Sequence, residues 1–92
     1  TNNVAEWRGA IAALDYALVN SRGAAVVLEM DSRLVVEQLT GRWRVKAFHL
    51  QVYVREGRER LERLRRRSVS MTVKWVPRAK NIEADRLAAG RK

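Results

Sequence analysis

The sequence contains no cysteine and only one proline and one histidine. Without cysteine, the protein can form neither disulfides nor thiolate-metal sites. It has no run of about 18 apolar residues, the length that a membrane-spanning helix requires. Its first residues also lack the basic and then apolar pattern of a signal peptide. We therefore expect a cytoplasmic protein.

Repeats, low-complexity tracts and linkers rich in proline, glycine or serine are absent as well. A chain of 92 residues is long enough for one domain. Its hydrophobic fraction of 47% is too high for a disordered basic tail. The sequence therefore predicts a single folded domain, over residues 1–92, with a small core.

The net charge of +9 is unevenly distributed along the chain. Residues 1–40 carry three basic and five acidic side chains, whereas residues 41–92 carry 16 basic and five acidic ones. A basic folded domain indicates a polyanionic partner, nucleic acid first of all. A surface that is basic and merely soluble explains the charge equally well.

Hydrophobic periodicity predicts a helix and then a strand in the first part of the chain. Residues 4–19 carry apolar side chains at helical spacing, and Asn3 and Glu6 can form a capping box at the start. Residues 24–30 form an apolar run with adjacent valines, which is typical of a strand covered on both faces in a parallel sheet.

A short helix is expected after this strand. Asp31 and Ser32 end the strand and can cap a helix that runs to Leu39, where Gly41 closes it. For residues 43–47 we expect at most a helical turn.

A long helix and a second strand are predicted in the basic half. Residues 49–67 carry a sparse apolar stripe and several Arg–Glu pairs at i,i+4 spacing, with Gly57 weakening the helix slightly. Residues 69–76 alternate between apolar and polar side chains, as a half-buried edge strand does. A last helix is predicted over residues 81–89, with Asn81 as its N-cap. Strands alternating with helices indicate an α/β fold with parallel strands.

Three carboxylates lie near strand ends and helix starts, where α/β proteins commonly have their active sites. Glu6 lies in the first turn of the first helix, Asp31 directly follows the first strand, and Asp85 lies one turn into the last helix. Each has an ordinary structural explanation as a cap or a surface residue. Together they provide oxygen ligands for hard cations such as Mg²⁺.

Motifs around these carboxylates resemble ribonuclease H type 1. They are TNNVAE at residues 1–6, MDS at 30–32, and VPR followed by NIEADRLA within 76–88, in the order of the family. Bacterial and archaeal members that lack the basic protrusion are the most similar, because no basic helix is inserted after Gly41. The domains appended to reverse transcriptases resemble the chain too.

The resemblance implies the three-layer ribonuclease H-like α/β fold and hydrolysis of the RNA strand of RNA–DNA hybrids with two Mg²⁺ or Mn²⁺ ions. Glu6, Asp31 and Asp85 match the catalytic, metal-binding carboxylates of the family. The positions expected to contact nucleic acid are Thr1, Asn2, Asn3, Ser32, Arg42, Arg44, Lys46 and Arg78. Among these, the two asparagines match positions that read the minor groove and its 2′-hydroxyls.

The sequence departs from the family in its last loop. Members commonly carry a histidine before the last helix, whereas residues 77–80 read PRAK. Arg78 or Lys80 stands in its place, and neither is a good general base near neutral pH. The sole histidine, His49, begins the long basic helix, where a structural or phosphate-facing role is expected.

The start of the chain is the second departure. The family begins with three antiparallel strands, the first of which carries a fourth aspartate, and the chain starts after them. We therefore expect two parallel strands plus helices, an incomplete domain whose missing strands come from the same protein or from another chain. The 92 residues alone are expected to be inactive.

Three functions remain open at this point. The first is a metal-dependent endonuclease acting on RNA–DNA hybrids. The second is a non-catalytic nucleic-acid-binding or assembly fragment that needs the missing strands in trans. The third is a basic helical interaction module built on residues 55–67, which explains neither the strands nor the acidic motifs.

Overall fold

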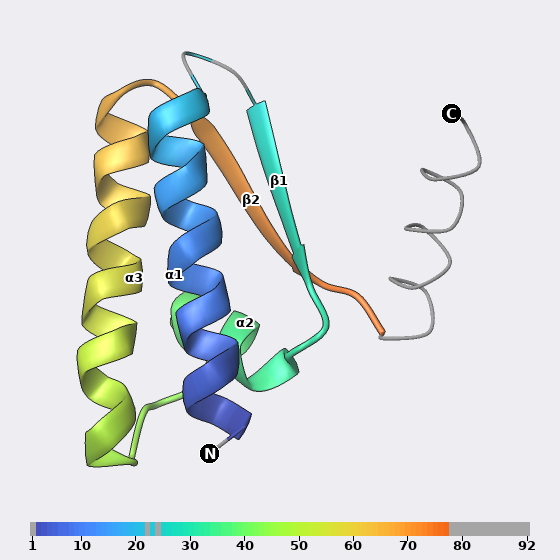
Figure 1. Ribbon diagram of the computed structural model, residues 1–92, viewed down its shortest axis with the longest axis vertical. Helices are drawn as coiled ribbons and strands as arrows, with labels where there is room; N and C mark the ends of the chain where they lie inside the picture. The colour runs from blue at the N-terminus through green and yellow to red at the C-terminus, as the bar shows by residue number, and fades with distance from the viewer. Residues whose placement is uncertain (1, 22, 24, 78–92) are drawn as a thin grey trace.

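The structure, a computed structural model, describes residues 2–21, 23 and 25–77, which form three helices and two strands (Figure 1). In chain order these elements are α1 (Asn2–Asn20), β1 (Ala25–Met30), α2 (Arg33–Leu39), α3 (Phe48–Arg66) and β2 (Ser70–Trp75). None of the described helices is long and apolar enough to cross a membrane. The helix predicted over residues 81–89 lies outside the described part of the chain.

The two strands pair in parallel, as the sequence predicts. Val26 lies opposite Met71 and Leu28 lies opposite Val73. Because parallel neighbours cannot be joined by a tight turn, the chain crosses from β1 to β2 through α2 and α3. The described part is thus an α/β fragment of two parallel strands and three helices.

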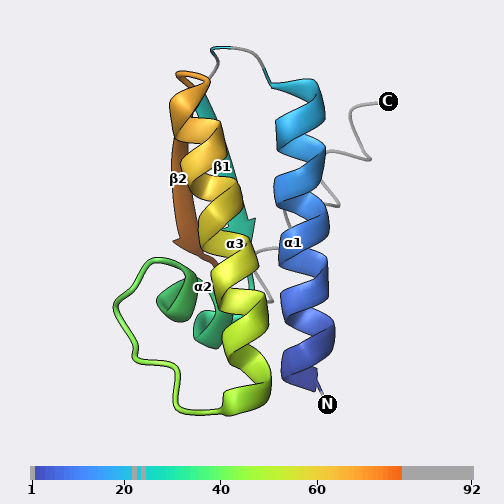
Figure 2. The same cartoon turned by 90° about the vertical axis from the view of Figure 1, so that its left-hand side faces the viewer.

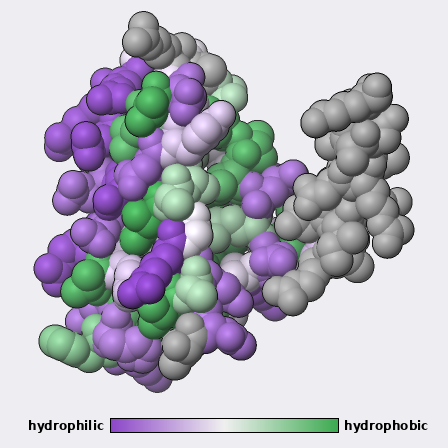
Figure 3. Space-filling view, viewed as in Figure 1, coloured by the Kyte–Doolittle hydropathy of each residue, from purple (hydrophilic) through white to green (hydrophobic). Residues whose placement is uncertain are grey.

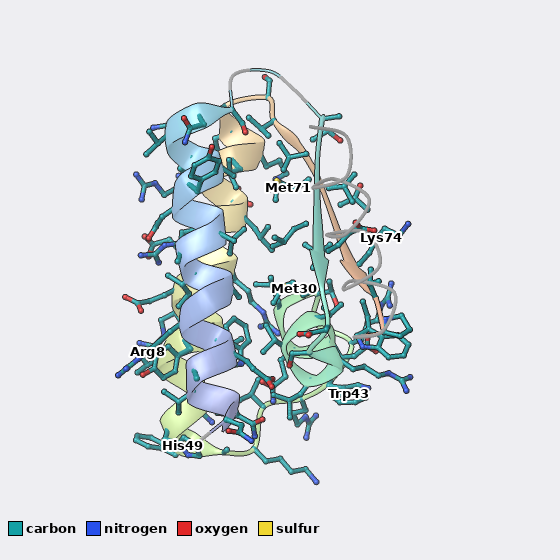
Figure 4. The ribbon with its side chains drawn as sticks, turned by 45° about the vertical axis from the view of Figure 1, so that its right-hand side comes forward. Arg8, Met30, Trp43, His49, Met71 and Lys74 are labelled. Carbon is teal, nitrogen blue, oxygen red and sulfur yellow. The ribbon has the colours of Figure 1, made fainter. Side chains whose placement is uncertain are left out.

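The helices α1 and α3 lie side by side against one face of this sheet (Figures 1 and 2). Their apolar stripes form the core together with α2, because each helix has one face that must be removed from water. In Figure 4 the side chains of Met30 and Met71 point from the sheet toward the helices, whereas Lys74 points away. The most deeply buried side chains of the core are Trp7, Leu14, Val35, Val36 and Leu64.

The prediction that β1 is covered on both faces is wrong for the described structure. Burial alternates along the strand: Val26, Leu28 and Met30 are half-buried, whereas Val27 between them is 56% exposed. The reason is that α1, α2 and α3 cover only one face. Apolar surface is visible over the sheet in Figure 3, while polar residues dominate along the side formed by α3.

One expectation about helix ends is wrong, and the expected cap of α2 at Asp31 and Ser32 is confirmed for Ser32 alone. The helix α1 already includes Asn2, so Asn3 lies inside its first turn and is not the N-cap of a capping box. The α2 helix is capped by Ser32, whose Oγ accepts a hydrogen bond from the backbone N–H of Val35 at 3.3 Å. The N-cap of α2 is therefore Ser32 and not Asp31.

Residues 43–47 form no helical turn. Gly41 adopts a φ of +84°, a conformation that glycine tolerates and that ends the helical path. The backbone N–H groups of Arg42 and Trp43 then both donate to the carbonyl of Glu37, at 2.9 and 3.1 Å. These bonds fold the start of the α2–α3 loop back against the end of α2.

The α3 helix has fewer internal ion pairs than the i,i+4 spacing predicts. Glu62 bonds to Arg66 as predicted, at 3.6 Å, and more closely to Arg65, at 2.7 Å. The hydrogen bond from Arg65 lowers the pKa of Glu62. Arg60 instead bonds to Asp15 of α1, at 2.6 Å, and so links the two long helices.

The backbone of α3 packs closely against α1 and α2 at Gly57. A Cβ atom there would lie 2.9 Å from Cδ1 of Leu39 and 3.0 Å from Cζ3 of Trp7. Gly57 is therefore required by packing, although the sequence predicts it only as a weak point of the helix.

We expect Gly57→Ala to destabilise the fold by about 1–2 kcal/mol, because overpacking outweighs the helix propensity gained, which is about 1 kcal/mol. Gly9→Ala on α1 is the matched control, since no atom of another described element lies within 4 Å of its added methyl group. The free energy of unfolding of this control should rise by up to about 1 kcal/mol. Urea unfolding of both variants measures the difference, and a stabilised Gly57→Ala would contradict the packing described.

Candidate metal and nucleic-acid site

Glu6 and Asp31 line one pocket of about 250 Å³ where α1 faces the end of β1. The wall formed by α1 is made of small residues at helical spacing from Glu6, namely Gly9, Ala10 and Ala13. Because these side chains are short, they leave room in front of the two carboxylates. Ser32 and Met30 complete the lining.

The end of β2 fixes the position of Asp31. The backbone N–H of Val76 donates to the carbonyl of Met30 at 2.8 Å, and Nε1 of Trp75 donates to the carbonyl of Asp31 at 3.3 Å. Ser32, the next residue, begins α2 as its cap. Asp31 is thus held between the ends of both strands and the start of a helix. Ligands of α/β proteins bind at such carboxyl ends of strands.

Glu6 is held by the packing of its neighbour on α1. Trp7 is fully buried, and its Nε1 donates to Oε1 of Gln38 at 3.0 Å. Nη2 of Arg58 donates to the backbone carbonyl of the same Gln38 at 2.9 Å. This network ties α1 to α2 and α3, so the helix that carries Glu6 cannot rotate freely.

A stack of two indoles and one guanidinium lies next to Asp31. The guanidinium carbon of Arg33 is 5.6 Å from the ring centroids of both Trp43 and Trp75. A cation over the face of an aromatic ring is attracted to it, and Arg33 makes this contact with both rings. The stack therefore links the start of α2, the loop that contains Trp43 (Figure 4) and the end of β2.

Sequence reasoning missed this stack, because its two tryptophans lie far apart in the chain. The only local signal was the position of Arg33, two residues after Asp31. It also missed that Arg55 and Arg58 of α3 lie near the arginines of the loop.

The structure brings together some of the predicted site residues. Glu6, Asp31 and Ser32 share the pocket, and Asn2 and Asn3 lie in the first turn of α1. The exposed side chains of Arg42, Arg44 and Lys46 belong to the α2–α3 loop, which lies on the side of α3 opposite α1 in Figure 2. Outside the described residues lie Thr1, Arg78 and Asp85.

The donor chemistry of the pocket fits a hard divalent cation. Its lining contains two carboxylates and no lysine or arginine, although the chain as a whole has a net charge of +9. Carboxylate oxygens are the ligands that Mg²⁺ and Mn²⁺ prefer. No group of three or more potential metal ligands occurs among the described residues, and Asp85 lies outside them.

The parallel strand pair, the helices on its face and the acidic pocket at the strand end define an α/β domain of the ribonuclease H-like class. Residues 1–90 match the family model described as reverse transcriptase-like, and the chain belongs to this family.

Curated relatives and solved structures agree with this assignment. The chain is 49% identical, over 88 residues, to the bifunctional protein Rv2228c of Mycobacterium tuberculosis and to the uncharacterized protein Mb2253c of Mycobacterium bovis. The match covers 96% of this chain and 23% of each relative.

Two solved structures superpose on the chain with a TM-score of 0.75 each. One is the N-terminal RNase H domain of Rv2228c from Mycobacterium tuberculosis, fused to maltose binding protein, at 44% identity. The other is RNase H1 from the halophilic archaeon Halobacterium salinarum, at 36% identity. Each match covers 95% of this chain but only 63% and 62% of the solved chains, respectively.

Proposed function

We propose that the chain forms part of a metal-dependent endonuclease that hydrolyses the RNA strand of RNA–DNA hybrids. The observation that carries this proposal is the pocket shared by Glu6 and Asp31. The chain that contains this pocket belongs to the reverse transcriptase-like family. The similarity to solved domains named RNase H supports the class of reaction.

Glu6, Asp31 and Asp85 are the residues proposed to hold the two ions, Mg²⁺ or Mn²⁺. When bound, such a pair of ions polarises the phosphodiester, activates a water and stabilises the leaving oxygen. The contribution of the chain is to keep the carboxylates in place. Glu6 is carried by a helix anchored through Trp7, and Asp31 is held by the end of β2. Supporting bonds of this kind reduce the rearrangement needed when ions bind.

Contacts to the hybrid are proposed on two sides of this pocket. Asn2 and Asn3 are close to Glu6 along α1, so their amides are suited to the 2′-hydroxyls that distinguish RNA from DNA. Ser32 accepts a bond from Val35 and still has a hydroxyl proton to donate. Phosphate contacts are proposed for Thr1, Arg42, Arg44, Lys46 and Arg78.

The test is cleavage of a hybrid by the full-length gene product, with the RNA strand labelled. We expect cleavage of RNA in the hybrid with Mg²⁺ or Mn²⁺, none after chelation with EDTA, and none of single-stranded RNA or duplex DNA. Raising the salt concentration should weaken binding steeply, because lysine and arginine contacts release counterions. Cleavage that persists in EDTA, or that is equally fast on single-stranded RNA, would refute the proposal.

A non-catalytic fragment is the second candidate, and one observation favours it. Within the described residues β1 pairs only with β2, so its other edge can accept a further strand. If another chain supplies a strand to this edge, the 92 residues alone bind a hybrid in a gel-shift assay without cutting it. Cleavage should then appear when the part of the Halobacterium salinarum RNase H1 chain that the match does not cover is added. Turnover by the 92 residues alone would rule this candidate out.

A further inference from the structure

A second pocket, separate from the one that contains Glu6 and Asp31, lies between the α2–α3 loop and the first half of α3. Its volume is about 670 Å³. None of its lining residues belongs to the acidic pocket. Four arginines line it: Arg42 and Arg44 from the loop, and Arg55 and Arg58 from α3.

The charges of these four arginines are poorly compensated. No acidic residue lines the pocket. The side chains of Arg44 and Arg55 have no hydrogen bond or ion pair within the described part of the chain. Arg58 uses one of its donors on the carbonyl of Gln38, and Arg42 lies 3.3 Å from a carboxylate oxygen of Glu37. Because an arginine has five donors, most of these guanidinium N–H groups remain available to an anion.

The rest of the lining is largely apolar. Trp43, Val45 and Val54 contribute to it, together with the amide of Gln51. Sites for small molecules typically have volumes of about 300–1,000 Å³ and combine apolar walls with a few polar groups. A ligand that matches both parts has a compact, highly charged anionic group and a flat, less polar body.

We propose that this pocket binds the polyphosphate group of a nucleoside di- or triphosphate. Such a ligand concentrates its phosphates in one place, as a concave cluster of guanidinium groups requires, whereas a duplex spreads its phosphates along each strand. The nucleotide and the hybrid share the exposed arginines of the loop. Only the nucleotide uses Arg55 and Arg58, which face the pocket from α3.

The experiment is a calorimetric titration of the full-length gene product with ATP, in the absence of divalent ions. We expect saturable binding at one site, and no binding of adenosine, which lacks the phosphates. Arg55→Gln should weaken ATP binding by about tenfold, since it removes one charge-assisted contact. The matched control is Arg63→Gln, an exposed arginine of the same helix outside the pocket, which should leave the affinity unchanged.

Binding of the RNA–DNA hybrid distinguishes this proposal from the function proposed above. Arg55→Gln should leave hybrid affinity unchanged, and Asp31→Asn should leave ATP affinity unchanged, because the two pockets share no residue. The proposal is overturned if ATP does not bind saturably, or if Arg63→Gln weakens binding as much as Arg55→Gln does. It is also overturned if Arg55→Gln weakens hybrid binding as much as ATP binding, since the pocket would then contact a nucleic-acid strand.

Discussion

Asp31→Asn is expected to abolish metal-dependent cleavage of RNA–DNA hybrids by the full-length gene product. Asparagine keeps the size of the side chain but removes the charge that attracts a divalent cation. Removing a residue that hydrogen-bonds to a metal ligand typically lowers metal affinity or activity by about 10–100-fold. Loss of a ligand itself should therefore lower kcat by about a hundredfold or more. The bond from Trp75 goes to the backbone carbonyl of Asp31, so it does not depend on the substituted side chain.

Glu29→Gln is the matched control for this variant. It makes the same change of charge two residues earlier on β1, but Glu29 is exposed on the face of the sheet away from the helices. Its cleavage rate should equal that of the wild type. Electron paramagnetic resonance of bound Mn²⁺ gives a second measurement, in which only Asp31→Asn weakens binding. Full activity of Asp31→Asn would remove it from the proposed metal ligands.

Trp7→Ala is expected to have the largest effect on stability. The indole is 0% exposed, and truncating a buried aromatic side chain to alanine typically costs about 3–5 kcal/mol. The change also leaves Oε1 of Gln38 without its donor, which adds to this cost. Small domains have a free energy of unfolding of only about 5–15 kcal/mol, so this variant should be close to unfolding.

Thermal or urea unfolding followed by far-ultraviolet circular dichroism measures this loss. Val19→Ala on the same helix is the control, because Val19 is 76% exposed and its truncation should change stability by at most about 0.5 kcal/mol. A loss below about 1 kcal/mol for Trp7→Ala would mean that the core is not organised around this side chain.

Most of the fold could be predicted because its elements have clear periodicity. The expected helices over 4–19 and 49–67 and the strand over 69–76 end within two residues of the observed ones. Burial of the first strand could not be predicted, because an apolar run fits a strand covered on one face or on both. The requirement for glycine at position 57 depends on Trp7 and Leu39, which are distant in sequence.

The candidate site could be predicted only in part. A carboxylate that directly follows a strand of an α/β sheet lies where such proteins bind their ligands, and Asp31 is such a carboxylate. That Glu6 lies in the same pocket depends on how α1 packs against the sheet, which no local pattern determines. Similarly, the contacts of Arg33 with Trp43 and Trp75 and the four-arginine pocket arise where separate elements meet.

The three tryptophans of the chain lie in different environments and can serve as separate optical reporters. Trp7 is fully buried, whereas Trp43 and Trp75, which both contact Arg33, are 40% and 44% exposed. Iodide in solution should therefore quench the emission of the stacked pair and leave the Trp7 emission intact while the core is folded. Occupancy next to Asp31 and unfolding of the core can thus be followed in one fluorescence spectrum without attaching a label.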